Sequence, residues 1–351
     1  MSQFNTLTIS DITRQTDQCV TLTFAVPDNL KQDYAFKAGQ YITLKTKIND
    51  AEVRRDYSLC SSPSSGILTV AVKAVPNGTF STYANSSLKA GDTLEVAKPQ
   101  GRFVFEPKAS EERTIAAFAA GSGITPILSI AKTVLEQEPK SHFVLVYGNK
   151  TVNDTIFLAD ILALHHQYPE RFYVQFLYSQ SQEENALFGR IEKSTVNLIV
   201  KNKYKHVTID AFYLCGPEAM INTVKEVLVE NNIAENTIHF ELFTAATQNT
   251  TTTVEATDGN TQITVTVDDE SETFTMSQKQ TILEAALKQD LDAPYSCQGG
   301  VCSSCIARVT DGQAIMRQNN ILTDAEVAEG LILTCQAHPT TPTLVVDYDD
   351  V

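Results

Sequence analysis

The amino-acid sequence predicts a multidomain protein with an antiparallel β-barrel, an α/β domain built on a parallel sheet, and a small α+β domain. Three observations predict this order. Apolar residues alternate with a period of two near the N-terminus, strands alternate with helices in the middle, and four cysteines gather near the C-terminus. The 351 residues also exceed the usual length of a single domain.

The first predicted domain, residues 1–108, has the pattern of short antiparallel strands. Apolar residues alternate with Thr and Ala over residues 20–26, and the same period recurs over residues 68–72. This alternation is typical of strands that bury one face. Turn-forming sequences separate the runs at 27–29, 37–39, 63–66 and 76–78. Several short strands with regular turns favour a closed barrel.

The second predicted domain, residues 109–243, alternates strands with helices. An apolar strand at Thr114–Ala120 leads into a Gly-Ser-Gly turn, and Pro126 suits the first turn of the helix that follows. Such alternation predicts a parallel sheet that binds a nucleotide at the carboxyl ends of its strands. Further strands are expected at 143–147, Phe172–Tyr178 and 211–215, and further helices at 156–167 and 217–231.

A segment rich in Thr, Asn, Gln and Ala, residues 244–261, is the predicted linker because it has little to bury. The third predicted domain is 262–351. It is expected to contain a strand at 263–267, a helix at Ile282–Lys288 and a terminal strand at 344–348.

Four cysteines in the third domain have the spacing C-x4-C-x2-C, followed after a long gap by a fourth. This is the plant-type arrangement in which four thiolates hold a [2Fe–2S] cluster. Gly299 and Gly300 would let the loop turn with its N–H groups aimed at the cluster sulfurs. A zinc site and a disulfide pair are the alternatives, although zinc ribbons usually contain two C-x2-C pairs. The predicted ligands are Cys297, Cys302, Cys305 and Cys335.

The net charge of −15 is concentrated at the C-terminal end, where residues from 262 onward carry 14 Asp and Glu against 4 Lys and Arg. An acidic domain argues against nucleic acid as a partner. It would suit docking onto a basic face of another protein, and simple solubility explains it equally well.

The sequence suggests a cytoplasmic protein that does not bind membranes. No apolar run approaches the length of a membrane span, and the first residues lack a basic stretch followed by an apolar core. The remaining cysteines, Cys19, Cys60 and Cys215, are expected to be free thiols, which suits a reducing cytoplasm.

Two short patterns in the first domain suggest a flavin site. On a strand, Arg55 and Tyr57 share one face, and Ser58 faces the other side. A guanidinium can hold a pyrophosphate and a phenol ring can cover a flat aromatic ligand. The segment 78–81, Gly-Thr-Phe-Ser, enters a helix-like stretch whose N–H groups could bind phosphate. Taken alone, the first pattern also fits a solvated strand face and the second an ordinary turn.

Two patterns in the second domain suggest a dinucleotide site. Gly121 and Gly123 follow a strand and open a helix, the context of a pyrophosphate contact, although the full glycine fingerprint is not present. Cys215 ends a later strand and Gly216 permits close backbone approach to a ligand. Cys215 could equally be a small buried apolar residue.

Taken together, these motifs resemble the ferredoxin–NADP reductase superfamily with an appended plant-type ferredoxin domain of β-grasp fold. The order of the flavin, nucleotide and iron–sulfur domains, with residues 54–60, 147–150 and 333–337, is similar to the reductase subunits of ring-1,2-phenylacetyl-CoA epoxidase. The resemblance implies FAD, a [2Fe–2S] cluster and NADPH or NADH as cofactors. It also implies an oxygenase component of a multicomponent monooxygenase as partner.

The resemblance also implies roles for single residues. Ser58, Cys215 and Glu241 would surround the reacting flavin and nicotinamide rings. Phe243 would lie against the flavin or belong to the core. The remaining implied contacts to FAD are Arg55, Tyr57, Gly78, Thr79, Phe80 and Ser81, and those to the nicotinamide nucleotide are Gly121, Gly123, Thr125, Gly216 and Pro217.

One position departs from the pattern of the superfamily. Members that bind NADPH often carry an Arg just after the strand Phe172–Tyr178, and here the sequence reads Ser179-Gln180-Ser181. Lys150 could supply the charge instead. The resemblance favours NADPH, and NADH remains the alternative.

The predicted activity is hydride transfer from NAD(P)H to FAD, followed by transfer of single electrons through [2Fe–2S] to a diiron oxygenase. The alternatives are a reductase for another oxygenase or for a hybrid-cluster protein, and a redox-sensing protein without turnover. His165 and His166 are interpreted as a surface pair, because no acidic or cysteine partners accompany them. His338 is not expected to bind the cluster, because four cysteines already satisfy it.

Overall fold

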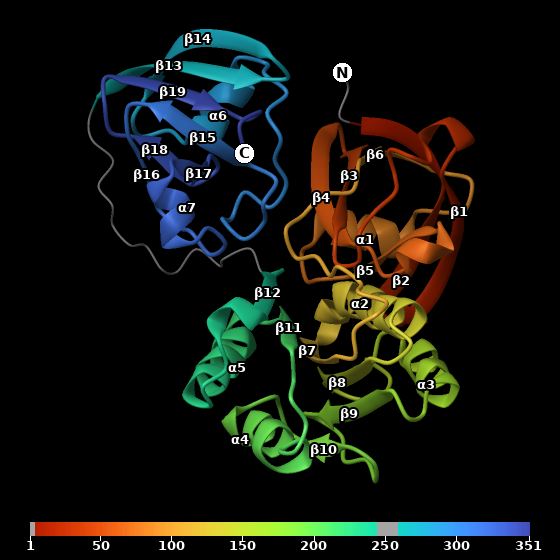
Figure 1. The fold of residues 1–351 in the computed structure, drawn as a ribbon. Coiled ribbons are helices and arrows are strands. Elements are labelled where there is room, and N and C mark those ends of the chain that lie inside the picture. The colour runs from red at the N-terminus through yellow and green to blue at the C-terminus, as the bar shows by residue number, and fades with distance from the viewer. Residues whose placement is uncertain (1–3, 244–258) are drawn as a thin grey trace. The chain divides into compact units, whose positions relative to one another are not determined.

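The computed structural model describes residues 4–243 and 259–351. These residues form two compact units, 2–241 and 242–351. Figure 1 shows the elements of each unit. Most of the predicted linker, residues 244–261, lies outside the described residues, and its last two residues begin a strand, β13.

The N-terminal part of the first unit is a six-stranded antiparallel sheet in the order β4-β3-β6-β1-β2-β5. Beyond the end of β4, Leu59 pairs with Val70 of β5, which brings the two edge strands together and closes one end of a barrel. Asn49 and Asp50 both have positive φ, 51° and 63°, as a two-residue hairpin turn requires. The elements are β1 Phe4–Thr16, β2 Cys19–Ala25, β3 Tyr41–Ile48, β4 Ala51–Ser58, β5 Leu68–Lys73, α1 Thr79–Ser86 and β6 Thr93–Ala97.

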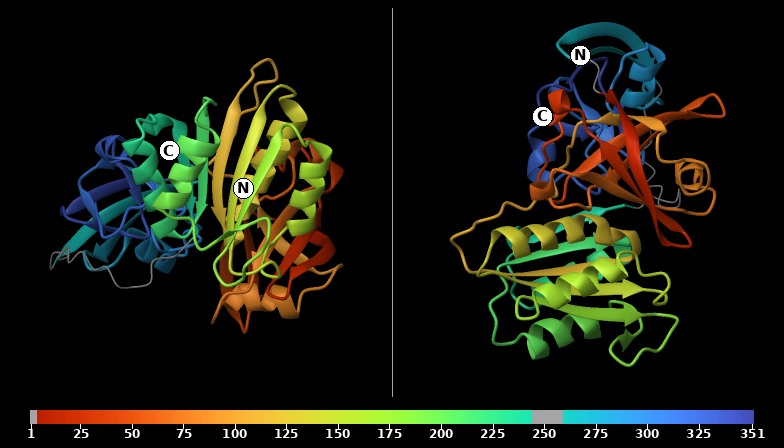
Figure 2. Two further views of the ribbon diagram at one scale, coloured as in Figure 1. Left: turned by 90° about the horizontal axis from the view of Figure 1, so that it is seen from below. Right: turned by 90° about the vertical axis from the view of Figure 1, so that its right-hand side faces the viewer.

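The second half of this unit is a six-stranded sheet in the order β10-β9-β8-β7-β11-β12, and it is parallel from β10 to β11. Helices α2 and α3 cover one face of the sheet and α4 and α5 the other (Figures 1 and 2). The elements are β7 Thr114–Ala120, α2 Ile124–Gln137, β8 His142–Asn149, α3 Leu158–Gln167, β9 Phe172–Tyr178, β10 Leu187–Phe188, α4 Lys193–Asn197, the π-helical turn η4 Leu198–Lys203, β11 Ala211–Gly216, α5 Glu218–Glu230 and β12 Ile238–Leu242.

The second unit contains a mixed five-stranded sheet, β14-β13-β19-β15-β17, and a small two-stranded sheet, β16-β18. Its two helices each begin with a capping box, Thr281 with Glu284 and Thr323 with Glu326, which satisfies the first free N–H groups of each helix. The elements are β13 Asn260–Val267, β14 Glu270–Ser277, α6 Ile282–Lys288, β15 Ile306–Asp311, β16 Ala314–Met316, α7 Asp324–Ala328, β17 Leu331–Leu333, β18 Ala337–Pro339 and β19 Thr343–Asp347.

The three predicted architectures are confirmed, and several elements agree residue by residue. The strand at Thr114–Ala120 and the helix at Ile282–Lys288 have the expected bounds. The predicted helix at 156–167 begins only at Leu158, because Phe157 before it adopts a left-handed conformation, φ 60°. In the described parts of the chain, no helix is long and apolar enough to cross a membrane.

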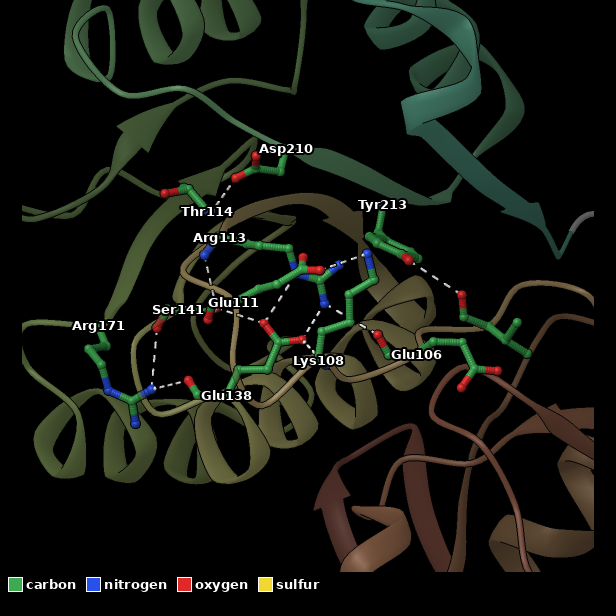
Figure 3. Close-up of polar contacts among 11 residues, drawn as sticks. Glu106, Lys108, Glu111, Arg113, Thr114, Glu138, Ser141, Arg171, Asp210 and Tyr213 are labelled. Atoms are coloured by element: carbon green, nitrogen blue, oxygen red, sulfur yellow. Dashed lines mark hydrogen bonds and ion pairs between the residues drawn. The ribbon is translucent and has the colours of Figure 1, made fainter.

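A buried charge network joins the segment between the two sheets of the first unit to the end of α2 (Figure 3). The Glu138 carboxylate pairs with Arg113 and accepts hydrogen bonds from Lys108 N, at 2.8 Å, and from Ser141 Oγ, at 2.7 Å. Arg113 in turn donates to the carbonyl of Glu106 and lies over the Phe105 ring. Glu138 is fully buried. It therefore fixes the chain that leaves the barrel against the parallel sheet.

Replacing Glu138 with Gln should lower the free energy of unfolding by about 3 kcal/mol, because it leaves Arg113 without its buried partner. Burial alone would raise the pKa of Glu138, but the hydrogen bonds from Arg113, Ser141 and Lys108 N hold it below its ordinary value of 4.5. The stabilisation is therefore present above about pH 4.5 and is lost as the pH falls through the lowered pKa. Urea unfolding at several pH values measures both effects.

The matched control is Glu106→Gln, because Glu106 pairs with Lys37 on the exposed surface. Such a pair contributes about 1 kcal/mol or less. Equal losses in the two variants would contradict a special role for the buried carboxylate.

Candidate functional site

Strand β4 presents two arginines with different surroundings. Arg54 is buried, pairs with Glu52 at 2.8 Å, and lies 5.2 Å from the centre of the Phe4 ring. Arg55 is exposed and donates to the Arg54 carbonyl at 2.6 Å. Arg54 therefore holds the barrel together, and Arg55 is the guanidinium available to a ligand at this surface.

Tyr57 and α1 lie together at the end of the barrel. The Tyr57 ring packs against Phe80 of α1 with 5.5 Å between ring centres. Burial raises the pKa of the Tyr57 phenol, so the ring stays neutral. A flat aromatic ligand would find an uncharged aromatic surface here.

The predicted phosphate segment 78–81 forms the start of α1. A Cβ at Gly78 would lie 2.2 Å from Ser81 Oγ, so a larger residue here would require the Ser81 side chain to move. The first N–H groups of a helix have no acceptor within it. The N-terminus of α1, beside Tyr57 and Phe80, therefore fits the phosphates of a flavin nucleotide.

The glycine turn after β7 packs directly against the end of β11. Gly121 has φ 56°, and its carbonyl accepts a hydrogen bond from Tyr147 Oη at 3.0 Å. A Cβ at Gly123 would lie 2.1 Å from the Cys215 carbonyl oxygen. The glycine at position 123 therefore brings the start of α2 against β11. Thr125 is buried and its hydroxyl donates to the Ser122 carbonyl at 3.1 Å, so in this structure the side chain stabilises the turn.

Three predicted residues that are far apart in the sequence come together where the barrel meets the parallel sheet. Ser58 Oγ, at the end of β4, donates to the Glu241 carboxylate of β12 at 3.2 Å. Burial raises the pKa of the Cys215 thiol, and Glu241 raises it further where its carboxyl is ionised. Ser58 and Glu241 thus form a polar pair, and the Cys215 side chain lies fully buried in the apolar core nearby, as expected for the small buried apolar residue that the sequence offered as the alternative.

The surroundings of Glu241 favour the protonated form of its carboxyl. The pKa of its carboxyl is raised from 4.5 to about 8, mainly by burial. The hydrogen bond from Ser58 opposes this rise, and the charge of Asp56 adds to it. A carboxyl that titrates near pH 8 where two cofactor-binding folds meet is a candidate functional group.

The edge of the sheet beyond β8 and β9 carries the departure noted in the sequence. Gln180 N donates to the Lys150 carbonyl at 2.8 Å, so the two segments lie side by side, and Lys150 itself is exposed. Ser181 Oγ is buried and has no partner among the described residues. Arg190 lies two residues after the end of β10. The residue between them, Gly189, donates its N–H to the Tyr178 carbonyl at 2.9 Å. This edge therefore presents the exposed cations Lys150 and Arg190, with the buried Ser181 hydroxyl behind them in the segment that the sequence had singled out, and Arg190 is the residue that the sequence patterns did not indicate.

The four cysteines of the second unit form two pairs. The thiols of Cys297 and Cys302 hydrogen-bond to each other, and so do those of Cys305 and Cys335. Two pairs of thiols fit the two irons of a [2Fe–2S] cluster. In the described ranges no group of three or more His, Cys, Asp or Glu gathers closely enough to hold one metal ion.

Backbone N–H groups surround these sulfurs. Gly299 N donates to Cys297 Sγ at 3.3 Å, and Gly300 N points at Cys335. Gly300 has φ 69°, as expected for the glycine of a tight turn. The other left-handed residue of the loop is Gln298, φ 52°, not Gly299. Such N–H groups stabilise negative charge on cluster sulfurs.

The remaining predictions concern histidines and Phe243. His165 and His166 are exposed, and His165 Nδ1 bonds the Phe172 carbonyl at 2.7 Å, which confirms a surface pair. His338 is buried with Nδ1 on the Gln278 carbonyl. Phe243 is 38% exposed, which argues against the core alternative.

Family models match all three parts of the chain. A model of oxidoreductase FAD-binding domains matches residues 6–105, a model of oxidoreductase NAD-binding domains matches 118–226, and a model of 2Fe-2S iron–sulfur cluster binding domains matches 265–340.

Full-length relatives share this organisation. One of the subunits of 1,2-phenylacetyl-CoA epoxidase from Escherichia coli (strain K12) is 37% identical, over 99% of each chain. The ferredoxin reductase component of 3-ketosteroid-9-alpha-monooxygenase from Rhodococcus rhodochrous is 32% identical, over 97% of this chain and 96% of the relative. The fold is also that of phthalate dioxygenase reductase, with a TM-score of 0.62 and 24% identity over 98% of each chain.

The chain therefore belongs to the ferredoxin-reductase-type family of NAD(P)H oxidoreductases that combine FAD-binding, NAD-binding and [2Fe–2S] domains and include the reductase components of oxygenases.

Proposed function

We propose that this NAD(P)H oxidoreductase supplies electrons to the diiron oxygenase component of a phenylacetyl-CoA epoxidase. The observation that carries the proposal is the 37% identity to the Escherichia coli relative, itself part of such an epoxidase, which extends over 99% of both chains. The two-unit organisation supports it, because a separate acidic unit that carries the cluster can present it to another protein.

When bound, FAD accepts a hydride from the nicotinamide nucleotide, and the [2Fe–2S] cluster passes single electrons onward. The protein's own residues orient these groups. Arg55 and the start of α1 would hold the flavin pyrophosphate, and Tyr57 would cover the ring. The glycine turn at Gly121 and Gly123, with Gly216 and Pro217, would hold the nucleotide phosphates beside Cys215.

Ser58, Cys215 and Glu241 would enclose the place where the two rings meet. Ser58 and Cys215 are buried and Glu241 is half-buried, which limits the access of water to the polar groups. The protonated Glu241 adds no charge beside the arriving hydride, and the Ser58 hydroxyl is held in a fixed place by its hydrogen bond. The four cysteines would hold the cluster.

The test is oxidation of NADPH and of NADH by the purified protein mixed with a phenylacetyl-CoA epoxidase oxygenase. Both nucleotides are compared with and without phenylacetyl-CoA. We expect oxidation that depends on both the oxygenase and the thioester. Oxidation with artificial electron acceptors alone would reject this partner and point to another oxygenase or to a hybrid-cluster protein.

The rate of flavin reduction should fall as the pH rises through about 8, where Glu241 ionises. The carboxylate then places a negative charge beside the hydride path and keeps the Ser58 hydroxyl as its donor. Glu241→Gln should give a flat profile between pH 7 and about 9. Stopped-flow reduction under anaerobic conditions measures both profiles, and an unchanged inflection in Glu241→Gln would assign it to another group.

Cys302→Ser should remove the cluster and leave flavin reduction by NAD(P)H intact, because the cysteine and the flavin residues belong to separate units. Iron content and visible absorbance report the cluster, and anaerobic bleaching reports the flavin. Cys60→Ser is the matched control with an intact cluster, since Cys60 is a buried thiol of the first unit. Loss of both cofactors in Cys302→Ser would contradict the modular account.

Arg55→Ala should purify with depleted flavin, because a bidentate contact to the pyrophosphate is lost. Arg308→Ala changes the charge equally in the other unit and should keep its flavin. The flavin-to-protein absorbance ratio measures both variants. Full retention in Arg55→Ala would remove this residue from the site.

A further inference from the structure

One face of α2 is attached to the loop that follows β4. Ser129, Lys132 and Glu136 are spaced three and four residues apart and therefore share a helix face. Ser129 Oγ donates to the Ser61 carbonyl at 2.7 Å, and Lys132 Nζ approaches the Cys60 carbonyl at 3.5 Å. The helix of the nucleotide domain thus binds the backbone of the flavin domain.

Glu136 makes the strongest of these contacts. A single oxygen of its carboxylate, Oε2, accepts hydrogen bonds from Ser62 Oγ at 2.5 Å and from Ser64 Oγ at 2.6 Å. Hydrogen bonds to a charged acceptor are about twice as strong as neutral ones. Ser62 is buried, whereas Glu136 and Ser64 lie at the surface, so the bond to Ser62 is the more protected of the two.

The loop that Glu136 holds directly follows Ser58 in the chain. Leu59 N donates to the Gln40 carbonyl at 2.9 Å and Cys60 N donates to the Thr69 carbonyl at 3.0 Å. The strand-like hydrogen bonding of β4 therefore continues into the first residues of the loop. Movement of Ser62 would therefore be transmitted to Ser58, four residues earlier.

The same helix also contacts the other side of the reacting site. Gly123, which precedes α2, packs against the Cys215 carbonyl so closely that no Cβ would fit. Helix α2 therefore lies between the Ser58 loop and the Cys215 strand and touches both.

We propose that Glu136, through Ser62 and Ser64, is a positioning residue for hydride transfer. It sets Ser58 relative to Cys215 and Glu241, and so aligns the flavin ring with the nicotinamide ring. Glu136 contacts neither ring itself. This inference rests on the hydride transfer assigned to the first unit, and it adds the element that controls its geometry.

The consequence is a specific kinetic signature. A displacement of about 1 Å between reacting groups can slow a reaction by about 100-fold. Loss of the carboxylate should therefore lower the limiting rate of flavin reduction, by roughly 10-fold for a smaller displacement. The nucleotide dissociation constant should not change, because the phosphate turn at Gly121 and Gly123 is untouched.

The experiment uses the full chain loaded with FAD and the cluster, mixed with NADPH under anaerobic conditions. The limiting rate of flavin reduction and the dissociation constant are obtained from the dependence on NADPH concentration. The variants are Glu136→Gln and the double variant Ser62→Ala/Ser64→Ala, which breaks the same contact from the other side. Glu235→Gln is the control, because Glu235 is an exposed carboxylate of the same unit.

The proposal predicts a lower limiting rate with an unchanged dissociation constant in both variants, and no further loss when they are combined. NADPH deuterated at C4 should show a primary isotope effect in each variant, which identifies hydride transfer as the slowed step. If Glu136→Gln does not fold, the limiting rate of the double variant Ser62→Ala/Ser64→Ala tests the proposal by itself.

A limiting rate equal to that of wild type and Glu235→Gln would overturn the proposal. So would a loss of rate that only follows loss of flavin or of thermal stability. Failure of both NADPH and NADH to reduce the flavin in the wild-type protein would instead contradict the assigned hydride transfer.

Discussion

The hydrogen bond between Ser58 and Glu241 is the contact on which the first unit depends for its chemistry. Hydride transfer requires the two rings to lie about 3 to 3.5 Å apart. Two independently folded sheets must therefore be held together to within a fraction of that distance. The barrel supplies Ser58 and the parallel sheet supplies Cys215 and Glu241. The buried Glu138 network and the α2 contacts fix the position of one sheet relative to the other around this point.

The two redox sites solve opposite electrostatic problems. Around Ser58, burial keeps the Cys215 thiol and the Glu241 carboxyl uncharged, which avoids repulsion where a hydride arrives. Around the cysteines, backbone N–H groups such as that of Gly299 point at the sulfurs and stabilise their negative charge. A low charge density suits transfer of an electron pair, and fixed dipoles suit a site that holds one extra electron. The two environments belong to different units of the chain.

Local sequence patterns predicted a large part of this arrangement. The period of two, the strand at Thr114–Ala120 and the cysteine spacing each depend on near neighbours in the chain, and the structure agrees with them. Contacts between distant segments could not be predicted in this way. Nothing around Glu136 or Glu138 signals a partner, because Ser62 lies 74 residues away and Arg113 lies 25 away. The distinction between Arg54 and Arg55 likewise depends on Phe4, which the fold places beside Arg54.

The central claim is that electrons pass from the nicotinamide nucleotide to the flavin and only then to the cluster. Rapid freeze-quench after anaerobic mixing with NADPH tests it most directly, with flavin absorbance and the electron paramagnetic resonance signal of the reduced cluster followed in parallel. The account predicts that flavin bleaching precedes the cluster signal, and that flavin-depleted protein gives no cluster signal. A cluster signal that appears at the same rate without flavin would contradict it.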